Sequence, residues 1–211
     1  QMSTFKFMGF ALTLVIMTGS VLFNSILIDW NAKIVLPEFL SELEQMMRSK
    51  EDELMALTKY LTDFENVGEF LMGILVIGVL AGIGEEVLFR GVLQPKLQLF
   101  TGNAHAAIWL SAFIFSAIHF QFYGFFPRMV LGAIFGYLYL YSGSLVYPIV
   151  GHILNNTFTV VLVYLNKLGK LEFNIEETEQ VSVPIALLGL VILVVGLRLF
   201  KEKSQIIGSD G

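Results

Sequence analysis

The sequence predicts an all-α fold: a polytopic membrane helical bundle with about six transmembrane helices plus an amphipathic helical insert. Hydrophobic residues make up 55% of the 211 positions and charged residues only 15%, whereas a soluble domain carries about 25% charged residues. The mean hydropathy is +0.73, and mostly apolar runs of roughly 20 residues, the length that crosses a bilayer, recur along the chain. Because lipid cannot satisfy free backbone groups, each span is expected to be helical. We expect residues 1–211 to form a single integral membrane domain.

Six apolar runs are predicted to be spans. They cover residues 5–29, 68–99, 104–122, 127–142, 144–166 and 182–199. The first run is longer than the core of a signal peptide, and no small-residue cleavage site follows it, so we interpret it as a span. Pro127 suits the first turn of the fourth span, whereas Pro148 lies inside the fifth and is expected to kink it.

The segment between the first two spans, residues 31–66, has a different pattern. Its apolar residues recur at helical spacing, and its other faces carry more acidic than basic side chains. The pattern predicts one or two amphipathic helices at the membrane interface or over the end of the bundle. A solvated cover is the favoured interpretation, and a gating lid is the alternative. The apolar positions are Leu36, Leu40, Leu43, Met47, Leu54, Leu57, Leu61 and Phe64.

The charge distribution limits the partners and the chemistry. The formal net charge is -5 and the sequence has no basic footprint, which argues against a nucleic-acid partner and leaves membrane lipid. Without cysteine there is no thiol nucleophile. A small excess of Lys and Arg near one set of span ends predicts a cell-membrane protein with both termini in the cytoplasm. The cytoplasmic side is assigned to Lys6, Lys96, Arg198, Lys201 and Lys203, and the other side to Arg128, Lys167 and Lys170.

The stretch LAGIGEEVLFRG, residues 80–91, places three charged side chains inside the second span. A charge at mid-bilayer costs about 3 kcal/mol on insertion scales, so such residues should face the bundle interior and find partners. Glu86 and Arg90 are four residues apart and share a helical face, which predicts an ion pair. Glu85 is turned about 100° away and has no local cation, so it is available as a general base. A purely structural ion pair is the alternative for Glu86 and Arg90.

Two histidines lie in later spans, each with a neighbour one helical turn away. Phe115 precedes His119 by four residues, and Asn156 follows His152 by four. A lone membrane histidine is more often a satisfied bundle residue, but two histidines, an asparagine and a spare glutamate on three helices can converge on one point. His105 sits beside a loop and is expected to face solvent.

These residue types favour hydrolysis by an activated water. A glutamate, with a histidine, can take a proton from water, while a histidine and an asparagine donate hydrogen bonds to the developing oxyanion. Zinc held by carboxylate and imidazole is a second option, but the sequence lacks the His-Glu-x-x-His signature of metalloproteases. We therefore expect no cofactor and no metal at the site. No Ser/His/Asp set is evident, which disfavours covalent acyl catalysis.

Three motifs occur in order on successive spans: Glu-Glu-x-x-x-Arg at 85–90, Phe-x-x-x-His at 115–119 and His-x-x-x-Asn at 152–156. In this combination the chain resembles the CPBP family, which contains CAAX prenyl proteases of type two and bacterial bacteriocin-processing and immunity proteins. The resemblance covers about residues 80–160, within a motif-bearing core at 68–166. It implies an intramembrane endopeptidase, a peptide hydrolase, with its cavity in the helical bundle.

The resemblance also implies a role for each motif residue. The first glutamate and first histidine are expected to activate water, the second glutamate and the arginine to position the site, and the last histidine and asparagine to form the oxyanion hole. Members were long labelled metalloproteases, but a glutamate-dependent, metal-free mechanism is the favoured interpretation. The residues at these positions are, in that order, Glu85, His119, Glu86, Arg90, His152 and Asn156.

Two other functions are left open. A non-catalytic membrane scaffold or bacteriocin-immunity protein of the same fold would tolerate Glu85→Gln. A proton-coupled transporter would use Glu85 and the histidines as a relay, but residues 100–165 supply no carboxylate for a continuous path. For a protease, the expected substrate is a peptide or small protein, and a prenylated protein and a leader peptide are both compatible with the sequence.

Overall fold

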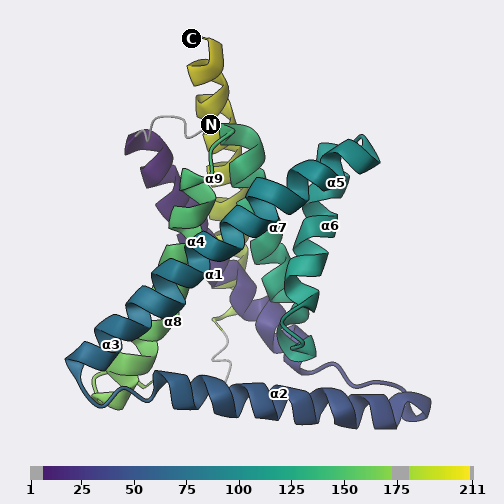
Figure 1. Cartoon of the computed structure of the whole chain (residues 1–211), viewed down its shortest axis with the longest axis vertical. Coiled ribbons are helices and arrows are strands. Elements are labelled where there is room, and N and C mark those ends of the chain that lie inside the picture. Colours follow the sequence, from purple (N-terminus) through teal and green to yellow (C-terminus); the bar gives the residue numbers. More distant parts are fainter. Residues whose placement is uncertain (1–6, 173–180, 210–211) are drawn as a thin grey trace.

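The computed structural model describes residues 7–172 and 181–209, with side chains described as far as residue 204. Within these residues all regular structure is helical (Figure 1). Two π-helical segments, η2 and η3, join α3, α4 and α5 into one continuous helix, and short 3-10 turns lie at Glu38–Leu40 and Phe122–Gly124. The elements are α1 Phe7–Ala32, α2 Ser41–Thr62, α3 Val67–Gly73, η2 Ile74–Leu80, α4 Ala81–Glu86, η3 Val87–Leu93, α5 Gln94–Thr101, α6 Ala104–Ala117, α7 Phe125–Ser142, α8 Val146–Lys167 and α9 Val183–Ser209.

Four of the described helices are long and apolar enough to cross a membrane: residues 7–32, 67–101, 146–167 and 183–204. They correspond to the first, second, fifth and sixth predicted spans, so the prediction of an all-α, multi-pass membrane bundle is confirmed. The third and fourth predicted spans are shorter helices. The 14 residues of α6 and the 18 of α7 extend about 21 and 27 Å, less than the roughly 30 Å of a hydrocarbon core. These two helices pack against each other as a hairpin.

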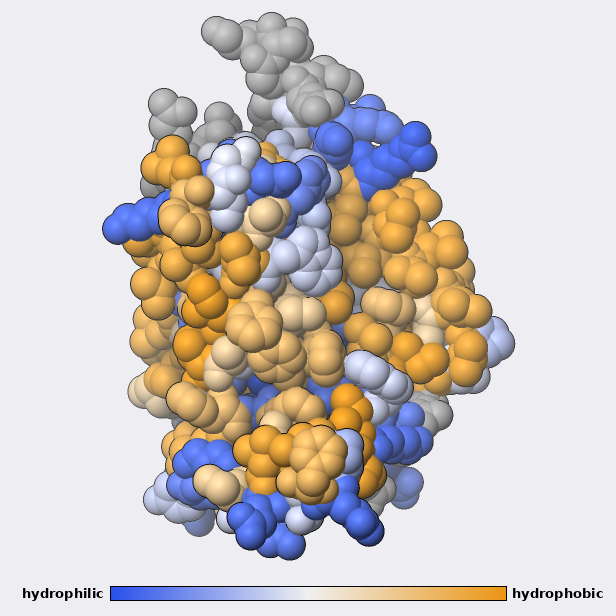
Figure 2. Space-filling model, turned by 90° about the vertical axis from the view of Figure 1, so that its right-hand side faces the viewer, coloured by the Kyte–Doolittle hydropathy of each residue, from blue (hydrophilic) through white to orange (hydrophobic). Residues whose placement is uncertain are grey.

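The surface has the character of a protein that contacts lipid. In Figure 2, hydrophobic residues cover the middle of the face shown, and hydrophilic residues gather toward its two ends. Large apolar side chains such as Leu75, Leu187 and Val191 are about half exposed. Such exposure is costly in water but not in a hydrocarbon environment.

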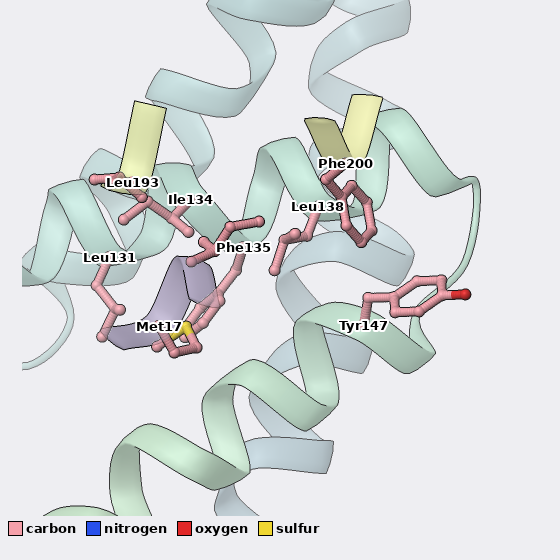
Figure 3. Packing of buried hydrophobic residues seen from close by; sticks show 9 residues of the cluster. Met17, Leu131, Ile134, Phe135, Leu138, Tyr147, Leu193 and Phe200 are labelled. Carbon is pink, nitrogen blue, oxygen red and sulfur yellow. The ribbon is translucent and has the colours of Figure 1, made fainter. Parts of the chain in front are cut away.

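The first and last described helices, α1 and α9, pack closely against each other. Glycines permit this approach: a Cβ on Gly19 would lie 2.6 Å from the backbone nitrogen of Leu193, and a Cβ on Gly189 would lie 2.8 Å from that of Phe23. The pair joins α7 and α8 in a buried cluster (Figure 3). This core holds α8, the helix that carries the third motif. The cluster comprises Ile16, Met17, Leu131, Ile134, Phe135, Leu138, Tyr147, Leu193 and Phe200.

Helix α2 lies across one end of the bundle (Figure 1). The predicted amphipathic insert is thus confirmed as one long helix. Polar contacts tie this segment to the bundle: Lys167 Nζ lies 2.6 Å from Oδ1 of Asp63, the residue after α2, and the backbone N–H of Tyr123 donates to Glu51 at 3.2 Å. Apolar residues of α2 such as Leu57 remain half exposed, which is typical of a helix at the membrane surface.

The kink expected at Pro148 is a wrong prediction. Helix α8 begins at Val146, so Pro148 occupies the first turn, where a backbone N–H has no intrahelical acceptor and proline removes no hydrogen bond. Pro127 lies in the first turn of α7, as predicted. His105 is exposed, also as predicted.

Candidate active site

The site is built on the continuous helix of residues 67–101, which crosses the bundle obliquely (Figure 1). Helix α4, with its two glutamates, lies between the π-helical segments η2 and η3. Hydrogen bonds in a π-helix run from residue i to i+5, and such segments are frequent at functional sites. The oblique course brings the middle of this helix close to α6, because the rings of Phe89 and Phe115 are 5.1 Å apart.

Glu86 and Arg90 form the predicted ion pair. Arg90 Nη1 lies 2.6 Å from Glu86 Oε1, and the side chains are 1% and 0% exposed. Nη2 donates to the carbonyl of Gly132 on α7 at 2.7 Å. The guanidinium also lies 5.0 Å from the ring of Phe115 and 5.4 Å from that of Phe135. A buried charge needs compensating contacts of this kind. Through them, Arg90 connects the second glutamate to α6 and α7.

His152 on α8 stands between the two glutamates. Its Nδ1 is 2.7 Å from Glu86 Oε1, and its Nε2 is 3.7 Å from Glu85 Oε2. A carboxylate oxygen can only accept, so Nδ1 carries the hydrogen of the short bond. The imidazole stacks on Phe135, with centroids 4.9 Å apart and planes 18° apart. Its orientation is therefore fixed, and Nε2 is presented to Glu85.

Glu85 is the accessible member of the acidic pair. Its side chain is 32% exposed, whereas Glu86 is 0% exposed. The gap of 3.7 Å to His152 is too long for a direct hydrogen bond, but two atoms so placed can both lie about 2.8 Å from one water oxygen. A ligand can approach Glu85 next to Gly84, because a Cβ added at Gly84 would meet no atom within 4 Å.

His119 lies in the turn after α6 rather than in the helix. Its Nδ1 donates to the carbonyl of Phe115 at 2.6 Å, which leaves Nε2 to accept or take up a proton. The ring of Phe115 contacts both imidazoles, with centroids 5.0 Å from that of His119 and 6.0 Å from that of His152. The two histidines therefore border the same aromatic side chain.

Asn156 follows His152 by one turn of α8, as predicted. Its Nδ2 donates to the carbonyl of Ile77 in η2 at 3.1 Å, and its Oδ1 accepts from Asn155 at 3.3 Å. One of the two Nδ2 hydrogens thus satisfies a backbone group of the irregular segment, and the other is free for a ligand. The side chain both supports η2 and can face a substrate.

The six predicted site residues do not all lie equally close to one another. Four form one contiguous group of contacts, the first histidine adjoins it through an aromatic ring, and the asparagine lies on the next turn of α8. Their chemical roles stay predictions. The contiguous group is Glu85, Glu86, Arg90 and His152.

Arg128 belongs near the site, although the sequence analysis assigns it to the span ends on the non-cytoplasmic side. Its Nη2 donates to Gln121 Oε1 at 2.7 Å, and its Nη1 is buried without a partner in the described residues. The guanidinium interacts electrostatically with Glu85 and with His119. The sequence feature that could have identified Arg128 as a site residue is its position directly after Pro127, at the start of an apolar run.

The residues present do not fit a catalytic zinc site. Such a site takes three protein ligands, and the described residues contain no group of three His, Asp or Glu side chains that could hold a metal ion. Glu86 Oε1 is already engaged by Arg90 and by His152. We assign no chemical step to a metal.

Comparison with known proteins agrees with the motifs. Residues 67–158 match the family described as type II CAAX prenyl endopeptidase Rce1-like, and this range includes all six predicted residues. The uncharacterized protein YpbD of Bacillus subtilis (strain 168) is 30% identical over 83 residues, which is 37% of this chain and 39% of that protein. The chain therefore matches less than half the length of this curated relative. No solved structure matches the chain.

Proposed function

Because residues 67–158 match the Rce1-like family of type II CAAX prenyl endopeptidases, we propose that this protein is an intramembrane endopeptidase. It hydrolyses a peptide bond at or near the membrane surface, using water activated by a glutamate. The observation that carries the proposal is the pair of atoms at the site: an accessible carboxylate oxygen of Glu85 faces Nε2 of His152 across 3.7 Å. One atom accepts a proton and the other donates a hydrogen bond, which are the two functions that hydrolysis requires.

In the first step Glu85 takes a proton from water, assisted by the free Nε2 of His119. The water oxygen forms a bond to the carbonyl carbon, and the π electrons move to the carbonyl oxygen. In the second step the carbon–nitrogen bond breaks, and the proton held by Glu85 goes to the leaving amine. The carboxylate is then restored.

His152 serves as a donor to the oxyanion only when both ring nitrogens carry hydrogen. Its Nδ1–H is committed to Glu86, so Nε2–H exists in the imidazolium form. The second Nδ2 hydrogen of Asn156 supplies another donor to the oxyanion. Glu86 and Arg90 hold the imidazole in place and do not touch the substrate.

We also propose that the enzyme resides in the cell membrane with both termini in the cytoplasm. The beginning of α1 and the end of α9 lie at the same end of the bundle (Figure 1), which supports termini on one side. The proposed substrate is a peptide or small protein, and the half-exposed apolar surface keeps the site close to lipid.

The test is cleavage of a peptide library by purified protein, with products identified by mass spectrometry. Glu85→Gln keeps the shape of the side chain but removes the proton acceptor, so the rate should fall by about 10²–10⁴-fold while the melting temperature holds. Glu202→Gln, at an exposed glutamate of α9, is the matched control and should cleave at the wild-type rate. A stable Glu85→Gln protein that cleaves at the wild-type rate would refute Glu85 as the base, and a wild-type protein that cleaves no peptide of the library would favour the non-catalytic alternatives.

A further inference from the structure

A cavity of about 560 Å³ lies beneath α2, between α1, the start of α7 and α8. Its wall carries two opposite charges, Glu51 on α2 and Arg128 on α7. It shares the wall residues Val21, Asn155 and Phe158 with a second, apolar cavity of about 340 Å³ between α1 and α8. The adjoining cavities thus offer a charged compartment and an apolar compartment to one ligand.

Arg128 is incompletely partnered within this wall. Gln121 holds Nη2, but Nη1 is buried and has no hydrogen-bond partner in the described part of the chain. A guanidinium taken out of water is best compensated by a carboxylate, which accepts from two N–H groups at once. Two other wall residues also carry buried polar atoms without partners, Tyr123 at Oη and Asn24 at Oδ1. Three residues of one cavity wall thus carry polar atoms for which a polar ligand would supply the missing partners.

Arg128 also connects the cavity with the candidate base. It interacts electrostatically with Glu51 on the side of α2 and with Glu85 on the side of the buried pair. His119 lies within its field as well. A charged group bound at Arg128 therefore acts on the electrostatics of the carboxylate that would activate water.

We propose that Arg128 forms an anion subsite that binds a carboxylate of the substrate peptide while apolar side chains occupy the adjoining cavity. The inference rests on the proposed function, since it names the substrate class of the same site. The carboxylate comes from the C-terminus of the peptide or from an acidic side chain near the scissile bond. Arg128 acts by holding the substrate and determines specificity; it takes no part in proton transfer.

The experiment measures binding of three fluorescein-labelled hexapeptides of Ala, Leu and Val to Glu85→Gln protein in nanodiscs, which does not cleave them. One peptide has a free C-terminal carboxylate, one a C-terminal amide, and one an amide with a single internal Glu. A charge-assisted pair in a poorly hydrated wall should make at least one carboxylate peptide bind about tenfold tighter than the neutral peptide. Comparison of the free acid with the internal Glu identifies the source of the carboxylate.

Three variants in the same background locate the effect. Arg128→Gln should reduce binding of the carboxylate peptide to that of the neutral one, and Arg198→Gln, at an exposed arginine of α9, should leave the preference intact. Glu51→Gln removes the carboxylate that faces Arg128, so the preference should rise by about twofold or more. This third variant keeps Arg128 in place and decides the question if Arg128→Gln does not fold.

Equal binding of all three peptides, a preference that survives Arg128→Gln, or a preference that falls on Glu51→Gln would each overturn the subsite. Cleavage by the wild-type protein separates this inference from the proposed function. A charge preference in binding without cleavage supports the subsite and counts against the endopeptidase. Cleavage that ignores the carboxylate supports the endopeptidase and overturns the subsite.

Discussion

Replacement of Arg90 by alanine removes the cation at the centre of the candidate site. The guanidinium is 1% exposed, pairs with Glu86 at 2.6 Å and donates to the carbonyl of Gly132 at 2.7 Å. Its loss leaves the carboxylate of Glu86, which is 0% exposed, with the Nδ1–H of His152 as its remaining polar contact among the described residues. Breaking a buried pair in this way costs about 3–5 kcal/mol, and for a chain of this size each kcal/mol lowers the melting temperature by about 2–4 °C. We expect a fall on the order of 10 °C.

The assay is thermal unfolding of purified protein in detergent, followed by tryptophan fluorescence, with two comparison variants. The double variant Glu86→Gln with Arg90→Met removes both charges, so it should be more stable than Arg90→Ala alone. Arg198→Ala breaks an exposed contact at 3.6 Å and should shift the melting temperature by no more than about 2 °C. The electrostatic reasoning fails if Arg90→Ala melts within 2 °C of wild type, or if the double variant is the less stable of the two.

Three other outcomes are expected. Asn156→Ala leaves the carbonyl of Ile77 without its donor, so the free energy of unfolding should fall by about 1–3 kcal/mol; an unchanged melting temperature would contradict this role. Burial raises the pKa of Glu51, so its charged form is disfavoured in the folded protein. Glu51→Gln should therefore raise the melting temperature at pH 7, and the gain should disappear as the pH falls through the raised pKa; an equal gain at pH 7 and pH 4 would count against it. The chain has no cysteine, so a single introduced cysteine can be labelled specifically with an impermeant maleimide. Lys203→Cys should react from the cytoplasmic side of the membrane and Glu53→Cys from the opposite side. Labelling of both variants from one side would refute the topology.

The features predicted best are those set within one helix. Glu86 and Arg90 meet because residues four apart share a helical face, and the contact holds although Arg90 lies in a π-helical segment. The contact between Glu86 and His152 joins residues from α4 and α8. This contact depends on the axial offset between the two packed helices, which the spacing of residues within either helix does not encode.

Irregular backbone explains most of the remaining differences. The sequence of η2 gives no sign of its π-helical hydrogen bonding, so Asn156 was assigned to the substrate without its bond to Ile77. Arg128 stands at the edge of an apolar run, which predicts only a span end, whereas in the structure its Nη2 donates to Gln121 in the turn before α7. His119 lies beyond the end of α6, yet the oblique long helix brings its neighbour Phe115 to the level of Phe89. Each of these depends on tertiary geometry.

The close packing of α1 against α9 through glycines has a consequence for the order in which the protein assembles during synthesis. A Cβ on Gly151, next to His152, would contact Met17 Sδ of α1 at 3.3 Å, so α1 forms the wall behind the histidine. Helix α1 precedes the other described helices in the chain, but the partner for the face around Gly19 emerges only with α9. Contacts between segments so distant in the chain form late. The wall behind the histidine therefore reaches its final packing only after α9 has entered the membrane.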